Sequence, residues 1–379
     1  MEKFSAYRDP GTGIQPFLTP VAPLGNEFLE KATLPIRLVL GVLRTALVLL
    51  LFITYFAVIR TASLVFIPIP PLYRLIEHIF LFIFGRTILF ILGLFWIAPE
   101  QATTKRGRKV REIETWKPKA GDVIVSNWIS WIEVVWLAIS YNPIFVIPIP
   151  ESLPDLSESS RSSTPLSFTP GRRTGTGSAN VQLPSKTATQ REPIRKFREV
   201  SLLSMINKTG HVPPFGFEKG NAKTLEEIRK GASKPVVLFP ECTTSNGRGL
   251  LRFADVFHQT APVKGYQVYV MCVRYDPPTS VSPTASLAIP SSFLNPLPHA
   301  FTLAKSLTPL QISIRQLPPS ESPSSPLIVV SELLSDFSGE DQVSEICAAL
   351  IAQIGKLKRT GMAWEDKFKF LDFYSAKGR

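Results

Sequence analysis

Hydrophobic positions divide the 379-residue chain into three parts. Residues 1–33 are polar and rich in Gly and Pro, with no apolar run before a small-residue cleavage site, so we expect no cleaved secretory signal. Residues 34–100 hold two long apolar stretches, and residues 101–379 return to the mixed pattern of a folded domain. This order predicts a membrane hairpin followed by one α/β domain.

A Pro-rich sequence at residues 67–74 separates the two apolar stretches, which is typical of a helical hairpin. Residues 45–59 form an uncharged run of about 22 Å of helix, shorter than a hydrocarbon core of about 30 Å. Residues 79–99 are long enough but include Arg86, which costs roughly 2.5–3.5 kcal/mol at mid-bilayer. The hairpin therefore either spans the bilayer with thinning or snorkelling, or lies in it as a re-entrant or interfacial element.

Both arrangements return the chain to the side from which it entered, so we expect the N-terminus and the domain after Gln101 to share a compartment. A basic cluster directly after the hairpin favours the cytosolic side. The cluster either touches anionic head groups or is a solvated flank. Its members are Lys105, Arg106, Arg108, Lys109 and Arg111.

From residue 121 onward, β-branched runs alternate with helical stretches, as they do in α/β domains. Residues 151–193 interrupt this pattern with Ser, Thr, Pro, Gly and Arg, and we expect a disordered insertion there. Two Pro/Ser-rich stretches, residues 276–290 and 317–326, are predicted to be surface loops. We predict strands at residues 122–127, 144–150, 235–240 and 266–275, and helices at residues 128–140, 197–210, 222–231 and 338–360.

Composition narrows the range of partners. The chain is 45% apolar and carries a net charge of +12, which suits an anionic membrane surface or a phosphate-bearing substrate. We expect no nucleic-acid partner, because the basic residues are scattered and no finger, helix-turn-helix or stacking platform uses them. Cys242, Cys272 and Cys347 are too widely spaced for a zinc pair, so neither a disulfide framework nor a metal site is expected.

The most specific motif is VVLFPECTTSNGRGLLRF at residues 236–253, where an apolar strand enters a polar loop. Open α/β sheets bind ligands at this end of a strand. Hydroxyls, backbone N–H groups and an arginine there can hold a phosphate, although the same pattern also fits a plain strand-to-helix turn. The polar side chains of the loop are Glu241, Thr243, Thr244, Asn246 and Arg248.

Two blocks of the chain resemble the phospholipid/glycerol acyltransferase family. SNWISWIEVVWLA at residues 126–138 is similar to the family's first block, Asn-His-x-Ser-x-x-Asp followed by an apolar helix. The motif from residue 236 is similar to the third block, Phe-Pro-Glu-Gly-Thr followed by Arg. The opening MEKFSAYRDPGTGIQPFLTP and the closing RTGMAWEDK resemble the fungal lysophosphatidic acid acyltransferase branch, so the resemblance covers most of the chain except the insertion.

The resemblance assigns the substrate or phosphate site to Glu241 and Thr243, with Pro240 shaping the turn and Ser130 keeping its place in the first block. The second block is only loosely echoed by TGHVPPFG at residues 209–216. Arg248 is a candidate for the missing phosphate charge. Four positions depart from the family pattern: Trp128 stands for histidine, Glu133 for aspartate, Cys242 for glycine and Thr244 for arginine.

The loss of the family's histidine bears directly on catalysis. Acyl transfer from a thioester to a hydroxyl needs a base, and histidine with a pKa near ~6.5 suits that role. Trp128 has an N–H donor and no basic site, so Glu133 and His211 are the candidate replacements, with Glu133 expected to matter more. We expect His258 to be structural on a helix, and His78 and His299 to lie in the hairpin and in a Pro-rich loop.

Two kinds of function therefore remain open. The resemblance implies a membrane enzyme that acylates lysophosphatidic acid or a related lysophospholipid, with acyl-CoA as co-substrate and no bound cofactor. The alternative is a non-catalytic relative that keeps the lipid-binding groove and serves lipid-droplet organisation or trafficking. Either protein is expected at the endoplasmic reticulum membrane and on lipid droplets, with membrane lipid as a partner and the domain in the cytosol.

Overall fold

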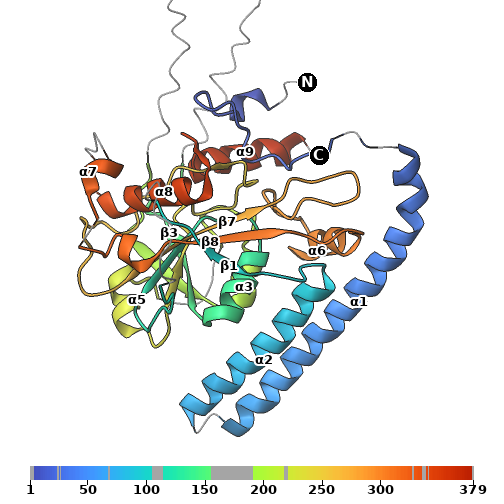
Figure 1. Ribbon diagram of the computed structural model, residues 1–379, viewed down its shortest axis with the longest axis horizontal. Coiled ribbons are helices and arrows are strands. Elements are labelled where there is room, and N and C mark those ends of the chain that lie inside the picture. The colour runs from blue at the N-terminus through green and yellow to red at the C-terminus, as the bar shows by residue number, and fades with distance from the viewer. Residues whose placement is uncertain are drawn as a thin grey trace, which may run out of the picture.

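The fold was analysed in a computed structural model of the chain (Figure 1). The structure describes residues 4–23, 25, 27–66, 69–104, 114–154, 191–216, 221–326, 328–334, 339 and 341–377. The basic cluster at residues 105–111 and residues 155–190 of the predicted insertion lie outside the described residues.

A seven-stranded sheet forms the centre of the domain, in the order β1-β8-β7-β2-β5-β3-β4. The neighbours β7-β2-β5-β3 are parallel, whereas β8 and β4 run antiparallel to β7 and β3. The parallel neighbours bring the carboxyl ends of β2 and β5 to one edge of the sheet. The strands are β1 (Pro99–Gln101), β2 (Val123–Ser126), β3 (Ile144–Ile149), β4 (Lys196–Val200), β5 (Val236–Leu238), β7 (Val268–Tyr275) and β8 (Ile312–Gln316).

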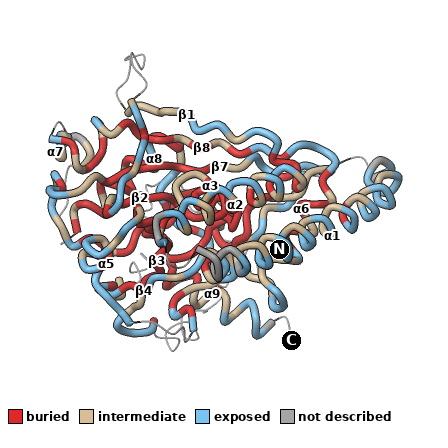
Figure 2. The backbone as a smooth tube through the Cα atoms, turned by 90° about the horizontal axis from the view of Figure 1, so that it is seen from below, coloured by how far each residue is buried: buried red, intermediate tan, exposed pale blue. Residues whose placement is uncertain are grey.

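Both faces of the sheet are covered by apolar side chains. In β2, Val123 and Val125 join the core on one face while Ile124 joins the core on the other, as the alternation of side chains along a strand requires. One core is closed by α3 (Ile132–Tyr141), α4 (Leu202–Asn207) and α6 (Leu297–Ala304), and the other by α5 (Leu225–Gly231) and α8 (Gln342–Gly355). The result is a three-layer α/β domain (Figure 2).

A second, smaller sheet and several further helices lie outside the central sheet. A two-stranded sheet pairs β6 (Gly249–Leu250) with β9 (Lys358–Arg359). The remaining helices are η1 (Ser5–Tyr7), η2 (Pro319–Glu321), α7 (Val330–Leu333) and α9 (Trp364–Lys377).

The N-terminal apolar region forms two antiparallel helices, α1 (Glu27–Phe66) and α2 (Pro70–Ile91). Among the described residues only α1 is long and apolar enough to cross a membrane, over residues 30–59 with a mean hydropathy of 2.4. Its 40 residues extend for about 60 Å, so the helix is much longer than the uncharged run at residues 45–59. Arg86 donates to the carbonyls of Leu94 and Phe95, and this supplies partners for a charge that the sequence left unexplained.

One stripe of α1 packs against the domain, a second packs against α2, and many of its other described residues are exposed. Gly41 faces Lys305, Arg44 donates to the carbonyls of Ala304 and Ser306, and Val48 packs on the core. These positions recur at helical spacing, so α1 lies along the side of the domain (Figures 1 and 2). The opposite side presents the apolar surface that makes α1 a candidate membrane anchor.

The N-terminal segment before the hairpin packs on the end of the chain. Phe17 is buried with its ring 5.7 Å from that of Phe370, and the Gly361 N–H donates to Asp9 over 2.8 Å. In Figure 1 both termini lie on the same side of the domain. These contacts place the N-terminal segment and the end of the chain next to each other on the domain.

Four sequence-based predictions of local structure were wrong. Residues 197–210 form β4 and then the short α4 instead of one helix, and the predicted last helix ends at Gly355. The supposed surface loops are partly buried, with Ala285, Leu287 and Ala288 buried in residues 276–290 and Leu317, Ser322 and Ser325 buried in residues 317–326. In each case contacts distant in sequence, which local patterns do not register, decide the conformation.

Candidate functional site

The two family-like blocks meet where β2 and β5 end. The loop after β2 and the loop after β5 are joined by a hydrogen bond of 3.0 Å from the Ser245 N–H to the carbonyl of Trp128. The third contributor is Leu287, whose N–H donates to the carbonyl of Ile129 and whose carbonyl accepts from Thr244 Oγ1. The buried stretch around Leu287 is therefore part of the site, a role that its Pro/Ser-rich composition conceals.

Trp128 places a large apolar ring in the loop after β2, where the sequence resemblance predicted a histidine. The side chain is 1% exposed and stacks on Phe239, with ring centroids 5.1 Å apart. Its Nε1–H donates to the carbonyl of Ser130 over 3.2 Å. The indole is thus packed and hydrogen-bonded inside the loop, with no group that accepts a proton.

Glu133 is fully buried in the first turn of α3. One carboxylate oxygen, Oε1, accepts the N–H groups of Ile129 and Ser130, each over 2.5 Å, and Oε2 accepts the hydroxyl of Tyr275. Burial raises the pKa of Glu133 to about 7, against the opposing effect of these donors. The carboxylate braces the loop before α3, and this geometry supports a positioning role over the expected role as base.

Glu241 is also completely buried, and both of its oxygens are engaged. They accept the N–H of Trp128 over 2.6 Å and the N–H of Leu251 over 2.8 Å. Burial raises the pKa of Glu241 to about 8, and the nearby Glu133 adds to the rise. The carboxylate therefore ties the first block to the third, while Pro240 beside it accepts the Ala254 N–H.

Lys367 in α9 is a member of the site that sequence reasoning missed. Its ammonium is completely buried and donates to Thr243 Oγ1 over 2.8 Å and to the carbonyl of Thr244 over 2.7 Å. Burial lowers the pKa of Lys367 well below its usual value, and only Glu241 opposes this effect. Lys367 ends the closing motif RTGMAWEDK, but no local sequence pattern links that motif to a loop over a hundred residues away.

His211 lies next to the third block. Its carbonyl accepts the hydroxyl of Thr243 over 2.7 Å, and within the described part of the chain its Nδ1 is buried without a hydrogen-bond partner. Burial, with help from the charges of Lys367 and Lys208, lowers the pKa of His211. The imidazole is therefore neutral at neutral pH and able to accept a proton.

The remaining predicted site residues divide into buried and exposed groups. Thr243, Thr244 and Ser130 are buried, and Ser130 Oγ has no hydrogen-bond partner among the described groups. Arg248 is exposed, four residues beyond Thr244, and stays a candidate for an anionic head group. No three His, Cys, Asp or Glu side chains in the described ranges are arranged to hold a metal ion.

An apolar cavity of about 390 Å³ lies between the hairpin and the domain. Phe52 and Gly85 line it from α1 and α2, Trp131 from the position just before α3, and Asn207 from the end of α4. The amide of Asn295, also in the wall, donates to the carbonyls of Asn207 and Thr209. The wall of the cavity thus continues into the loop that carries His211.

Two other histidines have structural roles. His299 lies in α6 and not in a loop, and its Nδ1 accepts the Trp131 Nε1–H over 3.0 Å. Burial lowers the pKa of His299 to about 4, so it stays neutral. His258 lies outside any helix, against expectation, and its Nε2 is 3.0 Å from the carbonyl of Ile194.

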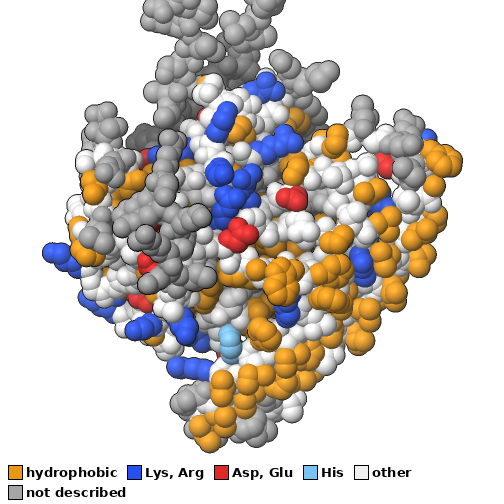
Figure 3. All heavy atoms as spheres, viewed as in Figure 1, with side chains coloured by type: hydrophobic (Ala, Val, Ile, Leu, Met, Phe, Trp, Pro, Cys, Tyr) orange, Lys and Arg blue, Asp and Glu red, His pale blue; other side chains and the backbone are white. Residues whose placement is uncertain are grey.

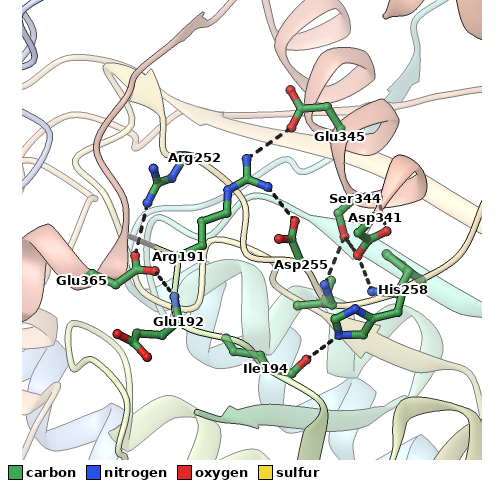
Figure 4. Close-up of polar contacts among 12 residues, drawn as sticks. Arg191, Glu192, Ile194, Arg252, Asp255, His258, Asp341, Ser344, Glu345 and Glu365 are labelled. Carbon is green, nitrogen blue, oxygen red and sulfur yellow. Dashed lines mark hydrogen bonds and ion pairs between the residues drawn. The ribbon is translucent and has the colours of Figure 1, made fainter. Parts of the chain in front are cut away.

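Figure 4 shows that His258 belongs to a polar network that fixes the chain after the predicted insertion. Arg191 pairs with Asp255 over 2.7 Å, and the Glu192 N–H donates to Glu365 over 3.2 Å. The Glu151 N–H donates to the carbonyl of Pro193, so the two ends of the insertion meet. Arg252, at the end of the motif that carries Glu241, pairs with Glu365 over 3.9 Å, so the network also meets that motif.

Comparisons of the chain with protein-family models, with curated proteins and with solved structures found no match.

The backbone at Cys242 favours the glycine of the family pattern. Cys242 has φ = 57°, a left-handed conformation that costs a residue with a side chain roughly 1–2 kcal/mol. We predict that Cys242→Gly is at least as stable as Cys242→Ala in thermal unfolding. At Cys272, buried in β7, we expect the alanine variant to be more stable than the glycine variant by about 0.5–1 kcal/mol. A glycine variant that is less stable than the alanine variant at both positions would contradict the interpretation.

The clamp formed by Lys367 should contribute to stability. Lys367→Met leaves the carbonyl of Thr244 without this donor, so we expect a loss of about 1–3 kcal/mol in unfolding free energy. Lys264→Met, at an exposed lysine, should change stability by less than about 0.5 kcal/mol. Equal stabilities of the two variants would show that the clamp is dispensable.

Stability should also depend on the protonation of Glu133. Because its pKa is raised in the folded state, the folded protein binds the proton more tightly than the unfolded chain, and this contribution is lost as pH rises from about 4.5 to 7. Glu133→Gln mimics the protonated form and should flatten the fall in thermal midpoint over that range. An unchanged slope in the variant would assign the pH dependence to other groups.

Proposed function

We propose that the protein is a membrane-bound acyltransferase that moves a long acyl chain from acyl-CoA to lysophosphatidic acid or a related lysophospholipid. The observation that carries the proposal is the apolar cavity between the hairpin and the domain, whose wall continues into the loop of His211. A cavity of about 390 Å³ lined almost entirely by apolar side chains suits an acyl chain.

His211 is the best-placed base for this reaction. In the proposed step the lysolipid hydroxyl attacks the thioester carbonyl, its proton passes to His211, and coenzyme A leaves as a thiol after taking that proton. His211 is neutral and its Nδ1 has no hydrogen-bond partner among the residues that the structure describes, whereas both oxygens of Glu133 and of Glu241 already accept hydrogen bonds. This reverses the sequence-based order, in which Glu133 ranked above His211.

The surroundings of His211 supply the rest of the proposed chemistry. Arg248 is exposed on the third-block loop and can pair with the phosphate of the acceptor. Lys367 and Glu241 hold that loop in place without touching the reacting atoms. Endoplasmic reticulum membrane and lipid droplets remain the proposed location, because lysophospholipids partition into lipid surfaces and α1 provides an apolar anchor.

One observation favours the alternative function, a non-catalytic lipid-binding protein of lipid-droplet organisation or trafficking. Trp128 is packed where the family's histidine stands, so the protein lacks the base that the fold usually presents at this position. Such a protein would use the same cavity to hold a lipid and would release it unchanged.

A transfer assay with purified full chain in lipid nanodiscs separates the two. Labelled long-chain acyl-CoA is offered with a panel of lysolipids, and binding of each lysolipid is measured independently. We expect turnover on lysophosphatidic acid and a loss of ~10²-fold or more in kcat for His211→Gln, with little change in lysolipid binding. His258→Gln is the matched control and should keep wild-type kcat.

The outcomes are distinct. Turnover that survives His211→Gln would show that another group is the base, while the proposed acyltransferase activity would stand. Binding of a lysolipid without turnover by wild-type protein would leave the lipid-binding alternative. Neither binding nor turnover, in folded and membrane-bound protein, would overturn both functions.

A further inference from the structure

An exposed apolar tip lies beside the hairpin, on a loop of the globular domain. Phe293 and Leu294 directly precede α6 and are 73% and 57% exposed. The next residue, Asn295, fixes the loop by donating to the carbonyls of Asn207 and Thr209. The tip is thus held in place with its apolar side chains outward, an arrangement that is unfavourable in water.

The tip belongs to the rim of the apolar cavity. Four apolar residues both line the cavity and remain at least 38% exposed, and with the exposed Asn207 they mark its mouth. Leu49 and Phe52 come from α1, Leu203 from α4, and Leu294 from the tip. The mouth is therefore surrounded by apolar side chains from three separate elements.

The position of the mouth on α1 determines what lies outside it. Leu49 and Phe52 fall within residues 30–59, the part of α1 apolar enough to cross a membrane. Whatever medium covers the exposed face of α1 at these residues also covers Leu203 and the tip. Figure 3 shows hydrophobic side chains gathered along the hairpin.

We propose that Phe293 and Leu294 insert into the lipid leaflet beside α1, so that the mouth of the cavity opens into the acyl-chain region and not into water. The occupant of this surface is membrane lipid, because the surface is continuous with the apolar face of α1 and none of the described residues that line the mouth is charged. The domain itself thereby becomes part of the membrane-bound surface. The inference does not depend on acyl transfer.

Site-specific labelling tests the insertion. Phe293→Cys and Leu203→Cys report on the tip and the mouth, Leu50→Cys on the exposed face of α1, and Val329→Cys on an exposed apolar position before α7. The three native cysteines are buried, so brief labelling with an environment-sensitive fluorophore selects the introduced thiol. Each full-length variant is reconstituted into phosphatidylcholine vesicles with or without doxyl-labelled phosphatidylcholine.

We expect a blue-shifted emission and quenching by doxyl lipid at positions 293, 203 and 50, and neither effect at 329. A water-like emission at 293 and 203 together with quenching at 50 would overturn the proposal. Absence of quenching at 50 would overturn it as well, since the hairpin would then lie outside the lipid. Should Phe293→Cys unfold the protein, Leu294→Cys reports from the adjacent position of the same tip.

Discussion

The arrangement of the site depends on the two hydrogen bonds that the carboxylate of Glu241 accepts. The carboxylate bridges the N–H of Trp128, after β2, and the N–H of Leu251, beyond β5, with no exposure to water. A carboxylate buried in this way is tolerated only when fixed donors replace water. Movement of either loop would leave the charge, or the two N–H groups, without partners, so the loops are held as one unit.

The ends of the chain reinforce that unit. Lys367 enters from α9 to bind Thr243 and Thr244, while the amide of Asn246 donates to the carbonyls of Gln15 and Leu18. The third-block loop is therefore enclosed by segments from opposite ends of the sequence. The opening and closing segments of the chain therefore help to position this loop although neither contains a candidate catalytic residue.

The sequence predicted the elements whose pattern is local. The apolar strands β2, β3, β5 and β7 and the two-helix N-terminal region were recognised because each carries its periodicity within a short window. The site could be located in outline, since parallel strands place their following loops together. The contacts of Lys367, Leu287 and His211 could not be predicted, because each joins residues that are brought together only by the completed fold.

The two departures in the first block are physically connected. An acid at position 133 that oriented a histidine at 128 would need a free oxygen directed toward that ring. Glu133 instead turns Oε1 back to the N–H groups of Ile129 and Ser130 and gives Oε2 to Tyr275, so the carboxylate stabilises the start of α3. A histidine placed at position 128 alone would find no free acceptor there. Glu133 and Trp128 therefore have structural roles, whereas the proposed chemistry depends on His211, which lies in the loop after α4.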